Sequence, residues 1–250
     1  MKTSRRIRRF RMIACEVSRR EVCAAAARSR NLIALDFLPK GLHDVGPERM
    51  RTCLQKAVEA RPWKGSEALL LWYGLCNNGI CGLRAPLTMV VPRAHDCLAL
   101  LLGSRDRFQQ YFEANPGTFY KSPGWIEKDT DPNDNPASIT ARMRLIRDRR
   151  ELAECYGEEN ADFIAPLTGD WLRHYRKLAF INTGVGDIEK YRGQAGKFAS
   201  ERHWEFEELK GDPGLLDRML AGDWNAEDFL VVPPGRTVRP TFQPDILECA

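Results

Sequence analysis

The chain has 250 residues, of which 43% are hydrophobic and 29% charged, and its formal net charge is +4. This composition excludes a disordered chain and is typical of a single globular domain with an insertion. No segment is long and apolar enough for a membrane span or a signal peptide, so we expect a cytoplasmic protein without a membrane partner. Because the cytosol keeps thiols reduced, the eight cysteines do not indicate a disulfide framework.

The first eleven residues are unusually basic and include six Lys or Arg, the last of them Arg11. Such a run can contact nucleic acid. No RNP-like motif or helix-turn-helix pattern follows it, however. We therefore interpret the run as a solvated lead-in to the first strand and expect no nucleic-acid partner.

Strands and helices alternate along the first half of the chain. We expect strands at 11–17, 32–38, 67–73 and 87–91, and helices at 21–30, 47–60 and from Asp96 toward Phe112. The stretch 68–72 is apolar on both faces, as a buried parallel strand is. The alternation predicts an α/β fold with a doubly wound, mainly parallel sheet of the Rossmann or flavodoxin-like type.

The second half begins with a segment of a different kind. Residues 117–136 are rich in Gly, Pro, Asp and Asn and are expected to form a loop or lid, and two helices at 139–156 and 159–175 complete an insertion over 117–177. The alternation then resumes with strands at 178–182, 204–209 and 229–232 and helices at 188–201 and 213–220. The tail from Pro233 is expected to lie along the surface, and the whole chain, 1–250, is expected to be one domain.

Cysteine and histidine residues follow four successive predicted strands. Cys15 ends the first, His43 follows the second, Cys76 follows the third, and His95-Asp96-Cys97 follows the fourth. Parallel strands all end at the same edge of a sheet, which is where such folds bind ligands. Thiolates with an imidazole suit zinc, and thiolates alone suit an iron–sulfur cluster. We therefore predict a metal site made of Cys15, Cys76 and Cys97, with His95 or His43 as the fourth ligand.

Each of these residues also has a structural interpretation. Cys15 can pack under the first helix, His43 can bond to local backbone, and Asp96 can cap its helix. As functional residues, His95 and Asp96 are candidate catalytic groups, with the carboxylate orienting the imidazole. A metal-free Cys–His pair with Cys97 as the nucleophile is a further alternative.

Two glycine-rich turns could approach a ligand. Gly74, Asn77, Asn78 and Gly79 surround Cys76, and the glycines would let the backbone come close to a cofactor. The turn at 182–187 resembles a phosphate cradle, but it lacks the full GxGxxG spacing, and we favour a plain tight turn. The aromatic segment 117–125 could cover the strand ends.

Five short motifs carry a resemblance to a known group of proteins. They are ACEV at 14–17, GLHD at 41–44, YGLCNNG at 73–79, PRAHDC at 92–97 and GTFYKSPGW at 117–125. Together they resemble an uncharacterised prokaryotic family that is often encoded near corrinoid-dependent methyltransferases. The resemblance implies one-carbon or methylamine metabolism and a corrinoid protein or corrinoid methyltransferase as partner.

The ligand set and the resemblance together predict a zinc or iron–sulfur protein in methyl-transfer metabolism. In the zinc form, an activated thiolate would accept a methyl group from a small-molecule substrate. Two alternatives stay open: an accessory protein that delivers metal or handles a corrinoid for a methyltransferase, and the metal-free Cys–His enzyme.

Overall fold

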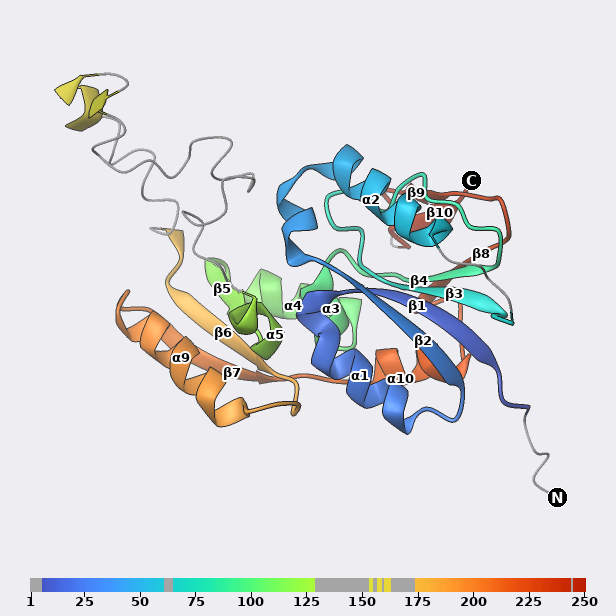
Figure 1. Cartoon of the computed structure of the whole chain (residues 1–250). Helices are drawn as coiled ribbons and strands as arrows, with labels where there is room; N and C mark the ends of the chain where they lie inside the picture. The colour runs from blue at the N-terminus through green and yellow to red at the C-terminus, as the bar shows by residue number, and fades with distance from the viewer. Residues whose placement is uncertain are drawn as a thin grey trace.

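The computed structural model describes residues 6–60, 65–128, 153–154, 157–158, 160–162, 174–243 and 245–250 (Figure 1). Most of the two helices expected at 139–175 lies outside these residues. The strands of the described part are β1 (Arg9–Cys15), β2 (Leu32–Leu38), β3 (Ala68–Trp72), β4 (Met89–Pro92), β5 (Thr118–Lys121), β6 (Lys177–Asn182), β7 (Glu205–Lys210), β8 (Phe229–Val232), β9 (Val238–Pro240) and β10 (Leu247–Cys249).

Helices connect these strands. They are α1 (Arg19–Arg28), α2 (Pro47–Glu59), α3 (Cys97–Leu101), α4 (Arg105–Ala114), α5 (Pro123–Glu127), α9 (Ile188–Ser200) and α10 (Gly214–Ala221), with short 3₁₀-helices η1 (Glu16–Ser18) and η2 (Lys40–Asp44). The predicted helix toward Phe112 is divided into α3 and α4 at Gly103, which has a φ of 73°. Only glycine adopts this left-handed conformation without steric cost, so the helix ends there.

The central sheet has the order β2-β1-β3-β4-β8 among the described strands. β1 pairs in parallel with both β2 and β3, and β3 with β4, while β8 joins β4 in antiparallel orientation. Every residue of β3 and β4 is buried, because helices cover both faces of a parallel sheet. This arrangement confirms the predicted fold class, a mostly parallel α/β sheet of the Rossmann or flavodoxin-like type.

The two faces of the central sheet carry separate hydrophobic cores. On one face, α1 and α10 pack against β1 and β3. On the other, α2 packs with the β9–β10 ribbon and with the cysteines of the strand ends. Figure 1 shows α2 above the sheet and α1 and α10 below it. Val238 and Leu247 are buried in the second core, so the tail expected to lie along the surface instead covers part of the sheet.

A second sheet corrects the prediction for residues 118–121. These residues form β5 rather than part of a loop, and they pair in parallel with β6, which pairs in parallel with β7. Of the strands expected after the insertion, β6 and β7 therefore belong to a separate sheet, whereas β8 joins the central sheet. Helix α9 buries its apolar side against β6, where Phe180 and Tyr191 meet.

Arg11 shows that the basic N-terminal run is not solvated throughout. Its side chain lies inside β1, pairs with Asp36 at 2.7 Å and donates to the carbonyl oxygens of Ala57 (2.7 Å) and Val58 (3.2 Å) at the end of α2. These contacts satisfy helix-end carbonyls that would otherwise lack partners. Arg11, which lies within β1, therefore has a structural role.

Candidate functional site

Three cysteines meet at the point where the central sheet reverses its winding order. The chain passes from β1 to β2 on one side and to β3 on the other, and such switch points are the usual ligand-binding crevices of open α/β sheets. Cys15 is the last residue of β1, Cys76 follows β3, and Cys97 is the first residue of α3. All three are buried in one cluster, which we call the thiol cluster.

The loop after β3 is joined directly to the loop after β4. The N–H of Leu75 donates to the Ala94 carbonyl at 2.8 Å, and the N–H of Cys76 donates to the His95 carbonyl at 2.9 Å. A Cβ at Gly74 would lie 2.6 Å from the backbone nitrogen of Asp96, so only glycine permits this approach. Gly74 thus acts through packing and holds Cys76 beside Cys97.

Cys76 begins a left-handed turn. Cys76, Asn77 and Asn78 have φ values of 45°, 56° and 63°. This conformation costs residues with a Cβ about 1–2 kcal/mol each, and strain of this kind concentrates at functional sites. The side chains of Asn77 and Asn78 are exposed, whereas Gly79 is buried against Met50.

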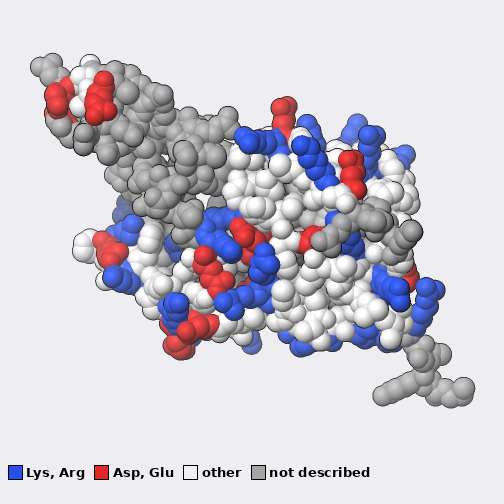
Figure 2. All heavy atoms as spheres, in the orientation of Figure 1, with Lys and Arg blue, Asp and Glu red and all other residues white. Residues whose placement is uncertain are grey.

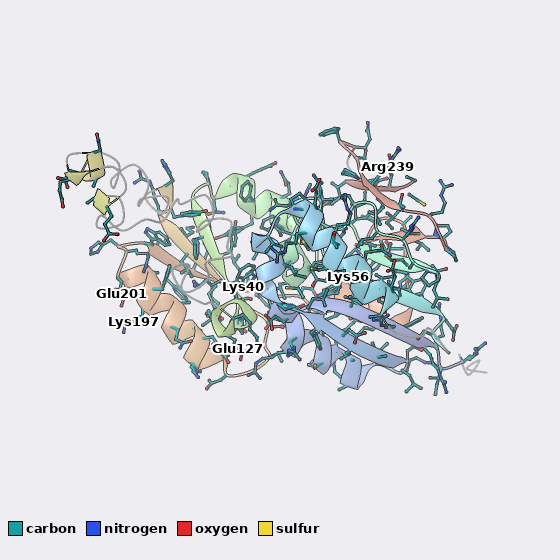
Figure 3. All side chains as sticks on the ribbon, turned by 45° about the horizontal axis from the view of Figure 1, so that its top comes forward. Lys40, Lys56, Glu127, Lys197, Glu201 and Arg239 are labelled. Atoms are coloured by element: carbon teal, nitrogen blue, oxygen red, sulfur yellow. The ribbon has the colours of Figure 1, made fainter. Side chains whose placement is uncertain are left out.

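Helix α5 from the second half of the chain closes the thiol cluster. The indole N–H of Trp125 donates to Sγ of Cys97 at 3.4 Å. The Lys40 ammonium lies 4.6 Å from the Trp125 ring centroid, and the Lys40 backbone N–H donates to Glu16 at 2.9 Å. Figure 3 shows Lys40 and Glu127 near the middle of the molecule, where η2 and α5 approach each other.

The thiols of the cluster hold their protons strongly. Burial raises the pKa of Cys15 to about 11 and that of Cys76 to about 12, and it raises the pKa of Cys97 well above its usual value. The cysteines add to this effect, because a negative charge on Cys15 or Cys76 raises the pKa of Cys97. At neutral pH the three sulfurs are therefore thiols unless a cation offsets their charge.

Tyr73 adds a polar group that sequence reasoning did not single out. Its hydroxyl is buried and has no hydrogen bond of ordinary geometry within the described residues. Burial raises its pKa, and charges on the nearby Cys15 and Cys76 raise this pKa further. The only sequence signal was its position directly after the buried strand β3. Tyr73 therefore brings an oxygen next to the sulfurs.

The remaining predicted ligands and catalytic groups lie differently. Asp96 accepts from the N–H groups of Leu98 (2.9 Å) and Ala99 (3.1 Å), so the structure gives it the helix-capping role. His95 is exposed, and the side chain of His43 lies outside the described part of the structure, although its backbone belongs to η2. Within the described ranges, no three His, Cys, Asp or Glu side chains are already arranged to hold a metal ion.

Comparison with known proteins identifies the family of this chain. The family model described as "Protein of unknown function (DUF1638)" matches residues 37–220, which is more than half of the chain. The chain belongs to the DUF1638 family. Cys76, Cys97 and Trp125 of this DUF1638 protein lie inside the matched range, and Cys15 precedes it. Neither the curated proteins nor the solved structures contain a match.

The surface around the thiol cluster of this DUF1638 protein carries both signs of charge. Arg20 pairs with Glu127 at 2.6 Å, and Lys128 pairs with Glu16 at 3.2 Å. Figure 2 shows Lys and Arg side chains mixed with Asp and Glu side chains on the visible face of the molecule. None of the helices in the described residues is long and apolar enough to cross a membrane.

Replacement of Gly124 with alanine tests how α5 is held in this DUF1638 protein. A Cβ at Gly124 would lie 1.6 Å from the carbonyl oxygen of Val17, so α5 must move away and Trp125 must leave Cys97. We expect Gly124→Ala to lower the free energy of unfolding by about 1–3 kcal/mol, as overpacking does, and to change the tryptophan fluorescence.

Gly193 provides the matched control. It lies in α9 with open space around its Cβ position, so Gly193→Ala should raise stability by about 0.5–1 kcal/mol. Urea unfolding of both variants measures the effects. Equal stability of Gly124→Ala and the wild type would show that α5 is not docked through Gly124.

Proposed function

We propose that this DUF1638 protein binds a thiophilic metal ion, zinc in preference, through the thiolates of Cys15, Cys76 and Cys97. The observation that carries the proposal is the burial of three thiols from separate loops in one cluster at the switch point of the sheet. Loops that contribute one thiol each are typical of catalytic metal sites, in which three protein ligands leave a position open.

The electrostatics of the cluster favour a cation. Beside the effect of burial, a charge on Cys15 raises the pKa of Cys76, and charges on Cys76 and Cys15 raise the pKa of Cys97. A divalent ion would offset this repulsion and deprotonate the thiols. Metal binding would require the thiol side chains to rotate toward one another. The fourth ligand would then be Tyr73, or His95 after its exposed side chain moves toward the thiols. His43 stays a predicted alternative.

The indole N–H of Trp125 donates to Sγ of Cys97 and would stabilise a thiolate there. Hydrogen bonds to a ligating sulfur tune its charge and orientation in metal sites. The Trp125 ring, with Lys40 packed against it, also shields Cys97 from bulk water. Burial dominates and raises the pKa of Cys15, but the positive charge of Lys40 opposes part of this rise, as a cation near a future thiolate should.

The reaction proposed for the zinc form is methyl transfer. Cys15, Cys76 and Cys97 would hold the zinc ion, and the ion would keep a thiol of the site deprotonated as an acceptor for a methyl group. In such a transfer the sulfur gains the C–S bond, and the atom of the small-molecule or corrinoid donor keeps the electron pair of the bond that breaks. The methyl-transfer setting comes from the resemblance described above. An accessory protein without turnover would bind the metal in the same way but give no methylated thiol.

The metal-free alternative has less support. A nucleophilic Cys97 needs a lowered pKa and a nearby base, whereas burial raises the pKa of Cys97 and His95 is exposed. The proposed metal site explains why three such thiols lie together.

Titration with Co²⁺ and Zn²⁺ at several pH values tests the proposal. Metal binding must displace thiol protons whose pKa values are raised, to about 11 for Cys15 and about 12 for Cys76. Between pH 6 and 8 the apparent affinity should therefore rise with pH, by about tenfold per unit for each proton released. Sulfur-to-cobalt charge-transfer absorption would report the ligands.

The preparation must be anaerobic, and its elemental analysis distinguishes the metals. About one equivalent of zinc per protein supports the proposal. Iron together with sulfide would instead indicate that the thiol cluster binds an iron–sulfur centre. An affinity that does not change with pH, or binding without thiolate absorption, would refute a thiolate site.

A further inference from the structure

A cavity of about 390 Å³ lies on the opposite face of the central sheet from the thiol cluster. It is bounded by α1 and α10, by the end of β3, and by the turns that follow β6 and β7, which point toward α1 and α10 in Figure 1. Trp72 lines this cavity, whereas its neighbour Tyr73 faces the thiols, because successive residues at a strand end point to opposite faces. The cavity is therefore a separate site.

Two residues that line the cavity each have a buried polar atom without a hydrogen-bond partner among the described residues. These atoms are Nε1 of Trp72, whose side chain is 2% exposed, and Oε2 of Glu21. The other oxygen of Glu21 accepts from the Thr183 hydroxyl at 2.6 Å, which fixes the orientation of the carboxyl group. Buried groups without partners cost about 1–3 kcal/mol each, so their presence at one cavity points to a ligand that satisfies them.

The rest of the wall defines the chemical character of that ligand. Leu100, Leu101 and Leu216 give an apolar surface. Among the lining residues, Asp212 and Asp217 carry two negative charges against the single positive charge of Arg28. Arg28 already pairs with Asp217 at 3.3 Å. This excess of carboxylates disfavours an anionic ligand.

We propose that the cavity binds a small neutral molecule of the amide or lactam class, whose carbonyl oxygen accepts from Trp72 and whose N–H donates to Glu21. The apolar part of the molecule packs against the leucines. Trp72 offers a donor and Glu21 an acceptor, so together they select a small apolar molecule that carries an acceptor next to a donor. The site does not depend on the metal proposal, since it uses none of the cysteines.

Burial raises the pKa of Glu21, and this gives the binding a pH dependence. Because a ligand N–H bonds best to the ionised carboxylate, binding should strengthen as the pH rises through the pKa of Glu21. The hydrogen bond from Thr183 lowers this pKa, the charge of Glu127 on α5 raises it, and Arg20, which precedes Glu21 in α1, lowers it.

The test compares two probes that differ in a single group. 2-Pyrrolidone has both the carbonyl and the N–H, and N-methyl-2-pyrrolidone lacks the donor. Titration of the full-length protein, followed through the indole N–H signals in NMR, should give saturable binding of 2-pyrrolidone with a shift of the Trp72 signal. N-methyl-2-pyrrolidone should bind about tenfold more weakly, as the loss of one hydrogen bond to a charged group predicts.

Variants assign the contacts. Trp72→Phe keeps an aromatic side chain but removes the indole N–H with its five-membered ring, and Glu21→Gln keeps the shape but removes the carboxylate, so each should weaken binding of 2-pyrrolidone by about tenfold. Trp224→Phe is the control, because the indole N–H of Trp224 donates to the Met219 carbonyl at 2.9 Å and Trp224 does not line the cavity.

Three results would overturn the proposal. They are the absence of saturable 2-pyrrolidone binding to the wild type, equal binding of the two probes, and tighter binding of propionate or ethylammonium than of 2-pyrrolidone. The comparison of probes needs no variant, so a folding defect in Trp72→Phe would leave the test intact.

Discussion

Replacing Cys97 with serine is expected to lower the affinity for Co²⁺ and Zn²⁺ by more than about 100-fold. Loss of an outer-shell partner alone typically costs about 10–100-fold in metal affinity, and Cys97 is proposed as a direct ligand. The hydroxyl of serine is not deprotonated as readily as a thiol and is a poorer ligand for zinc. Cys15→Ser and Cys76→Ser should behave in the same way, because the three sulfurs belong to one buried cluster and are proposed to bind the same ion. Competition titration with a chromophoric chelator measures the change.

Cysteines outside the thiol cluster provide the controls. Cys23 is exposed on α1, and Cys53 is partly exposed on α2. Cys23→Ser and Cys53→Ser should therefore leave the metal affinity unchanged. A loss of affinity in these controls equal to that of Cys97→Ser would place the metal elsewhere and end the proposal.

Replacing Arg11 with alanine is expected to lower the free energy of unfolding by about 3–5 kcal/mol, the usual cost of breaking a buried ion pair. The guanidinium is nearly buried and bonds to Asp36 and to the two carbonyls that end α2. Its loss leaves the Asp36 carboxylate without this charge partner and removes donors from the end of α2. Urea unfolding, followed by circular dichroism, measures the difference.

An exposed ion pair gives the matched control for Arg11. Arg28 and Asp217 are about half exposed and lie 3.3 Å apart. Since surface pairs contribute about 0–1 kcal/mol, Arg28→Ala should change stability by less than about 1 kcal/mol. The double variant Arg11→Met/Asp36→Leu separates two causes of the loss. If it is more stable than Arg11→Ala, the cost of Arg11→Ala comes from the unpaired Asp36 charge. If the double variant is no more stable, the cost comes from the lost contacts with α2.

Local patterns along the chain predicted most elements of the central sheet. The apolar run of β3 and the Pro47 that begins α2 are local signals, and the structure has β3 at Ala68–Trp72 and α2 at Pro47–Glu59. The end of a parallel strand is also a local feature. For this reason the positions of Cys15, Cys76 and Cys97 at one edge could be inferred from the order of the strands.

Other features could not be read from local patterns. Residues 118–121 form β5 because β6 offers them a partner, and turn-forming neighbours concealed the strand. Arg11 was grouped with solvated basic residues, since a sequence does not show that the end of α2 lies beside β1. The tail ribbon is buried through contacts with a core built from distant residues.

The order of hydrophobic and polar residues by itself determined that this chain builds a mostly parallel sheet with Cys15, Cys76 and Cys97 near the strand ends. Only the tertiary structure decided that Asp96 caps a helix while His95 faces solvent, that Trp125 covers Cys97, and that Tyr73 joins the thiols. The physical reason is that strand order follows from short-range patterning, whereas side-chain contacts depend on how closely loops from distant parts of the chain can pack. Gly74 and Gly124 allow that packing, because a Cβ at either position would collide with a neighbouring backbone.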